Sequence, residues 1–119
     1  MQDFRQLKVW EKTHKLALDT YRATRQFPRD EAFGLTAQLR RAAVSIPANI
    51  AEGCGRTGDR EFGRFLGMAL GSASELEYHL LFAHDLAFLT DQDFKHLTEG
   101  VVEVKRMLAG LVQSMKKRG

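Results

Sequence analysis

The chain has 119 residues, of which 44% are hydrophobic and 28% charged, and its formal net charge is +3. These values are typical of one globular domain over residues 1–119, and they exclude a disordered tail or a collagen-like repeat. No apolar run reaches the roughly 18–20 uncharged residues of a membrane span, and the charged N-terminus does not resemble a secretory signal. We therefore expect a cytoplasmic protein with no membrane partner, which its single cysteine, Cys54, also fits.

Apolar residues recur at helical spacing in four segments, about residues 6–26, 30–52, 59–89 and 91–117. The first segment ends at Phe27-Pro28, and the glycine-rich stretch 53–58 separates the second from the third. In the fourth segment the apolar steps alternate between three and four residues, which is the heptad seam of packed helices. Since the connections are short and no segment alternates like a strand, the sequence predicts an all-α, antiparallel up-down four-helix bundle.

One residue interrupts the second segment. Pro47 removes a backbone donor and disfavours helical geometry at the residue before it. We therefore expect a kink or break near residues 43–47, with Ser45 able to cap a restarted helix.

The end of the third segment is apolar on every side. One stripe per helix is enough for a four-helix monomer, so the remaining side chains need a loop or another subunit to cover them. The short connections favour a subunit. The expected oligomer interface comprises Leu81, Phe82, Leu86 and Phe88.

Charge is unevenly distributed along the chain. Residues 75–104 contain seven acidic residues against Lys95, a balance of −6, so the rest of a chain with net charge +3 carries +9. Two groups of cations are candidate nucleic-acid contacts: Lys8, Lys12, Lys15 and Arg22 in the first segment, and Arg56, Arg60 and Arg64 around the start of the third. The same asymmetry also fits complementary subunit faces or an ordinary solvated helix surface.

No catalytic, metal or cofactor motif emerges. Residues 53–58 match the letters G-x-G-x-x-G, but a nucleotide-binding loop must follow a strand, and here a helix precedes it. A di-iron bundle needs Glu-x-x-His pairs on two helices, and the chain does not have two such pairs; Cys54 has no neighbouring base. We therefore expect no enzymatic activity and no cofactor.

Polar residues follow the margin of the apolar stripe in two segments. In the second segment they are Gln38, Arg41, Ser45, Asn49 and Glu52, and in the third Ser72, Glu75 and His79. Such residues usually form hydrogen bonds between helices or subunits that fix register, and a ligand or RNA site is the alternative interpretation. Arg41 with Glu75 is the expected buried pair.

These motifs also carry a resemblance. The chain contains Phe4-x-x-Leu7-x-x-Trp10, Phe27-Pro28, the block from Gln38 to Gly53, Arg56, Glu61-Phe62-x-x-Phe65-Leu66 and Gly71-Ser72-x-x-Glu75-Leu76-Glu77. This pattern, over about residues 4–80, resembles the four-helix-bundle proteins encoded in bacterial 23S rRNA intervening sequences. The resemblance implies a ring-like homopentamer, similar in architecture to the accessory proteins of diversity-generating retroelements, which bind a reverse transcriptase and nucleic acid. Arg41, Ser45, Asn49, Glu52 and Glu75 carry over as family positions without a known chemical role.

Two functional hypotheses follow. The first is a non-enzymatic homo-oligomer that binds RNA, or an RNA-handling protein, through its basic surface, because a ring multiplies weak phosphate contacts. The second is a protein-interaction scaffold with no nucleic-acid binding, whose cations are merely solvated.

Overall fold

Four long α-helices make up most of the chain. The computed structural model describes residues 2–118, in which α1 spans Lys8–Thr24, α2 Leu35–Cys54, α3 Asp59–Asp85 and α4 Asp91–Arg118. Two short 3-10 helices, η1 (Phe4–Gln6) and η2 (Arg29–Glu31), precede α1 and α2, and residues 2–118 contain no strand. The predicted all-α four-helix bundle is confirmed.

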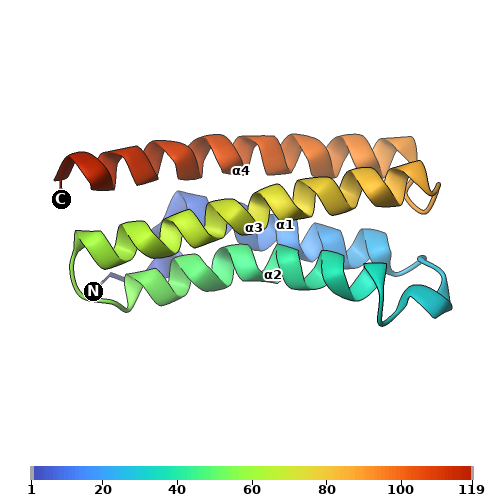
Figure 1. Cartoon of the computed structure of the whole chain (residues 1–119), viewed down its shortest axis with the longest axis horizontal. Helices are drawn as coiled ribbons and strands as arrows, with labels where there is room; N and C mark the ends of the chain where they lie inside the picture. Colours follow the sequence, from blue (N-terminus) through green and yellow to red (C-terminus); the bar gives the residue numbers. More distant parts are fainter. Residues whose placement is uncertain (1, 119) are drawn as a thin grey trace.

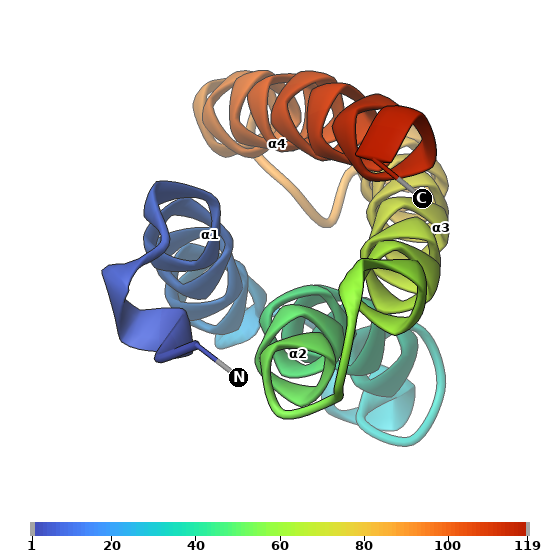
Figure 2. The same ribbon diagram turned by 90° about the vertical axis from the view of Figure 1, so that its left-hand side faces the viewer.

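The helices lie along the long axis of a molecule that measures 45 × 22 × 20 Å (Figure 1). The chain turns back at each connection, so the start of α1 and the end of α4 lie at the same end of the bundle. Viewed end-on, α1, α2, α3 and α4 follow one another round a ring (Figure 2). The apolar stripes of all four helices meet inside this ring.

Each helix contributes fully buried side chains to the core. The largest are Leu39, Ile46 and Ile50 of α2, Leu66, Leu76 and Leu80 of α3, and Leu97, Val101, Val104 and Leu108 of α4. Burying each one stabilises the fold by about 1.5–3 kcal/mol. In α1, Thr13 and Thr20 are also buried in the core. Each hydroxyl group donates a hydrogen bond to a backbone carbonyl one turn back, at 2.8 Å, and this bond offsets the cost of burying a polar group.

Two details of α2 differ from expectation. The helix begins at Leu35, later than residue 30, because η2 forms first and the Glu31 carboxylate accepts a hydrogen bond from the Leu35 amide, at 3.1 Å. It then continues through Pro47 as one helix, so the predicted break with a restart at Ser45 is wrong. Pro47 is buried in the core, where packing offsets the lost hydrogen bond. The kink in the axis stays a prediction.

The third helix also ends earlier than expected, at Asp85. Ala87 has a positive φ of 64°, its amide donates to His84 O, and the Phe88 amide donates to Ala83 O, both at 2.9 Å. These two bonds form a Schellman cap, which usually places glycine at the left-handed position. The turn directs Leu89 into the core and leaves Phe88 half-buried beside Phe27, with ring centroids 5.7 Å apart. Phe88 is therefore covered largely within the chain rather than left for a partner.

Replacing Ala87 by glycine should raise the free energy of unfolding by about 0.5–1 kcal/mol, because glycine adopts a positive φ without a Cβ clash. Urea denaturation followed by circular dichroism measures the change. The matched control is Ala109→Gly at an exposed position inside α4, which should cost about 1 kcal/mol. Equal losses in the two variants would contradict the left-handed cap.

Candidate nucleic-acid interface

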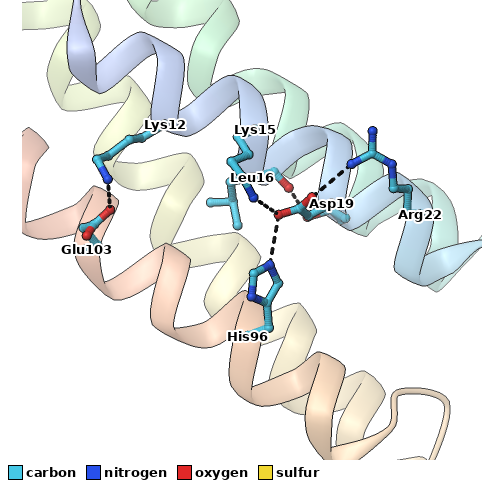
Figure 3. Close-up of polar contacts among 8 residues, drawn as sticks. Lys12, Lys15, Leu16, Asp19, Arg22, His96 and Glu103 are labelled. Atoms are coloured by element: carbon cyan, nitrogen blue, oxygen red, sulfur yellow. Dashed lines mark hydrogen bonds and ion pairs between the residues drawn. The ribbon is translucent and has the colours of Figure 1, made fainter.

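Three of the four predicted cations of α1, Lys12, Lys15 and Arg22, lie beside the seam between α1 and α4 (Figure 3). Lys12 Nζ is 2.8 Å from Glu103 Oε1 of α4, and both side chains are about half exposed. Lys8 is exposed and has no ion pair within residues 2–118. One of these two lysines is thus already paired across the seam.

Asp19 lies at the centre of a second group of contacts in this seam (Figure 3). Its Oδ2 accepts hydrogen bonds from Lys15 Nζ, at 3.1 Å, and from His96 Nε2 of α4, at 3.0 Å. Its Oδ1 accepts one from Arg22, at 3.2 Å, and the Asp19 side chain is only 16% exposed. Two of the four predicted α1 cations therefore share one carboxylate on their own helix.

Sequence reasoning missed Asp19 as part of this surface. The signal for two of its contacts was present, since Lys15 and Arg22 are four and three residues away and so face it across one helical turn. The contact with His96 spans 77 residues and depends on how α4 packs, which spacing alone does not reveal.

The pKa of Asp19 reflects this setting. Burial on its own raises the pKa, but the hydrogen bonds from His96 and Lys15, with their positive charge, lower it below the ordinary value of 3.8. The carboxylate is thus held in its charged form. Beside it the helices approach closely, because a Cβ on Gly100 would lie 3.1 Å from Leu16 Cδ1.

The second predicted group of cations flanks the start of α3. Arg56 pairs with Glu52, at 2.8 Å, and Arg64 pairs with Glu61, at 3.1 Å. The hydrogen bond from Arg64 lowers the pKa of Glu61. Arg60 is exposed and pairs with no carboxylate within the described residues. This group therefore presents one uncompensated cation rather than three.

The polar margin between α2 and α3 contains a real interhelical contact. Ser45 Oγ and Ser72 Oγ are 2.9 Å apart, and Asn49 Nδ2 donates to the carbonyl and hydroxyl oxygens of Ser45, at 2.9 and 3.1 Å. All three side chains are half-buried. Gln38 and Glu52, from the same predicted stripe, are exposed. The contact that joins the two helices is thus made by hydroxyl groups.

The predicted buried pair of Arg41 and Glu75 is wrong. Both residues are exposed, and the Glu75 carboxylate pairs instead with His79 Nε2, one turn along α3, at 3.1 Å. Removing either charge should therefore leave no stranded ion in the core of this chain.

An apolar patch lies on the outward side of α3. Leu81, Phe82 and Leu86 remain 46%, 45% and 46% exposed, and Tyr78, which sequence reasoning did not select, is 59% exposed. The Tyr78 and Phe82 rings contact each other, with centroids 6.2 Å apart. Residues 2–118 leave about half of each of these four side chains uncovered, and we call the four side chains the α3 outer patch.

Neither a metal-binding cluster nor a membrane-spanning helix is found in the part of the chain that the structure describes. Residues 2–118 contain no group of three His, Cys, Asp or Glu side chains placed to hold a metal ion. None of their helices is both long and apolar enough to cross a membrane. Burial raises the pKa of the Cys54 thiol, and the glycines after it end α2 and lead into α3 rather than following a strand.

The fold thus defines a strandless four-helix-bundle protein whose surface combines ion-paired cations with an apolar patch. Its sequence matches the profile of the family described as 23S rRNA-intervening sequence protein over residues 5–110, so the chain belongs to that family. A crystal structure of a protein with unknown function from the S23 ribosomal protein family of Bacteroides thetaiotaomicron VPI-5482 has the same fold, with a TM-score of 0.79. The two sequences are 23% identical over 87% of this chain and 97% of that chain. No curated protein matches the chain.

Replacing Asp19 by asparagine should lower the free energy of unfolding by about 1 kcal/mol near neutral pH, because Lys15, Arg22 and the His96 imidazole lose a charged acceptor. Since folding lowers the pKa of Asp19, its contribution is present above about pH 4 and is lost as the pH falls through the folded value. Urea denaturation at several pH values should show the wild type and Asp19→Asn converging in acid. A constant difference at all pH values would contradict the role of the charge.

Proposed function

We propose that this chain is a non-enzymatic homo-oligomer that binds RNA, or a protein that handles RNA, through a basic surface. The observation that carries the proposal is the separation of charge, −6 within residues 75–104 and +9 elsewhere. Much of the positive charge gathers at the end of the bundle where α1 starts, α3 starts and α4 ends (Figure 1). There the cations are Lys8, Arg56, Arg60, Arg64, Lys116, Lys117 and Arg118. Such a cluster favours a polyanion.

The proposed oligomer rests on the α3 outer patch. Four large apolar side chains in contact with solvent are costly for a monomer and typical of an interface. The family resemblance favours a pentamer. Several copies in a ring would present the basic end repeatedly, which converts weak phosphate contacts into useful affinity.

The identity of the partner has a second source of support. The architecture that the family resemblance implies, similar to that of the accessory proteins of diversity-generating retroelements, favours a nucleic-acid enzyme as the protein partner if the partner is not RNA itself. On this proposal the bundle performs no chemistry itself and positions RNA for that enzyme.

A scaffold without RNA binding is the second candidate, and one observation favours it. Lys12, Lys15 and Arg22 already have carboxylate partners, so the α1 face offers little free positive charge. If the remaining, unpaired cations are merely solvated, the α3 outer patch would be the functional surface.

An RNA titration at increasing salt separates the two candidates. RNA binding through phosphates should appear at low salt and weaken as salt is added, with a logarithmic slope of about 0.7–0.9 per contact. Changing Lys8, Lys12 and Lys15 together to glutamine should flatten that slope if the α1 face takes part. Glutamine is the appropriate choice because glutamate at Lys12 would repel Glu103. The scaffold candidate predicts no retention of RNA at low salt.

The oligomer has its own test. Light scattering of the wild type at micromolar concentration should give a multiple of 13.5 kDa. Phe82→Glu places a charge in the α3 outer patch and should shift the mass toward the monomer, while the helical circular-dichroism signal remains. The matched control is Ser74→Glu, an exposed position on the same helix outside the patch. A monomer mass for the wild type would contradict the assembly.

A further inference from the structure

A groove lies between the first turns of α3 and the last turns of α4. Its volume is about 820 Å³, and it is open to solvent at the basic end of the bundle. Gly63 allows this approach of the helices, because a Cβ there would lie 3.0 Å from Met115 Cβ. Met115 and half-buried Val112 give the groove an apolar lining. We call this hollow the α3–α4 groove.

Charge in the groove is only partly compensated. Glu61 is paired with Arg64, and Asp59 is paired with Arg118, at 3.0 Å. Arg60 and Lys116 also line the groove, and neither pairs with a carboxylate within residues 2–118. Two cations from different helices are therefore available to one anionic ligand.

The side chain of Arg64 provides a flat platform beside these cations. The Glu61 carboxylate accepts hydrogen bonds from Arg64 Nε and Nη2, at 3.1 and 3.2 Å, and these two bonds fix the plane of the Arg64 guanidinium. The guanidinium carbon lies 4.6 Å from the centroid of the Phe65 ring, yet 56% of the Arg64 side chain remains exposed. A planar guanidinium held in this way is a surface on which an unpaired nucleobase stacks.

We propose that the α3–α4 groove binds one nucleotide unit of single-stranded RNA. Arg60 and Lys116 contact its phosphate, while the base lies against the Arg64 guanidinium and the apolar side chains of Val112 and Met115. The volume is within the range of small-ligand sites, about 300–1,000 Å³. A duplex keeps its bases stacked inside and reaches only the cations, so the groove favours the single strand. This inference rests on the proposed function and assigns it a surface other than the α1 face.

The experiment measures fluorescence anisotropy of a labelled oligouridine and of an RNA duplex of the same length, at several salt concentrations. The groove variant carries Arg60→Gln and Lys116→Gln, and the matched control carries Arg29→Gln and Lys95→Gln, two exposed cations at the opposite end of the bundle. The groove variant should bind oligouridine about tenfold more weakly, and its salt slope should fall by about 1.4 for two lost contacts. The control should stay within about twofold of the wild type.

A second variant tests the stacking platform. Arg64→Lys keeps the charge but removes the plane, so it should weaken oligouridine binding and leave duplex binding unchanged. Circular dichroism and the oligomer mass show whether each variant stays folded.

The failures are distinguishable. If the wild type retains no RNA at low salt, the proposed function and the groove both fail. If RNA binds but the groove variant and the control weaken it equally, or if only the α1 lysine variant weakens it, the groove is overturned and RNA binding stands. Equal loss of single-strand and duplex binding in Arg64→Lys would overturn the stacking role.

Discussion

The bundle depends on the burial of one apolar stripe from each helix, since most helical stability in proteins comes from tertiary packing of an amphipathic face. α4 has two neighbours in the bundle. It packs on α3, to which a short loop joins it, and it also reaches α1, to which no loop joins it directly. Gly100 makes that reach possible by admitting Leu16 of α1 into close contact. The hydrogen bond between Asp19 and His96 then adds a polar contact beside this packing, so apolar fit and charge act together along the seam.

Pairing of charges determines which parts of the surface remain available to a partner. Net charge and helical spacing treat every lysine alike, yet a lysine that already faces a carboxylate gains less from a phosphate, because binding must first break or share an existing contact. This effect lowers the expected contribution of Lys12 and Lys15 and raises that of Arg60 and Lys116. The basic end of the bundle is thus a stronger candidate for the partner-binding surface than the α1 face.

The fold was predictable because apolar stripes repeat over many residues and average out local exceptions. The local exceptions themselves were not predictable from the sequence. Ala87 adopts a left-handed conformation at a position where glycine is usual, so the sequence does not signal the turn. Packing of the neighbouring side chains compensates for the backbone strain. Arg41 and Glu75 lie on the predicted polar stripes, but the rotation of each helix about its axis decides which side of a stripe is covered. Spacing identifies a stripe and leaves that rotation undetermined.

The two proposed surfaces lie toward opposite ends of one helix. α3 has 27 residues and is about 40 Å long at about 1.5 Å per residue. The α3–α4 groove begins at its first turn, whereas the α3 outer patch occupies its last two turns and the residue that follows them. Self-association through the patch would therefore leave the groove open. An assembly built in this way would also hold the grooves of its copies in a fixed arrangement, so a flexible single strand could occupy more than one groove at once. Affinity for long RNA would then depend on assembly, even though no groove residue belongs to the interface.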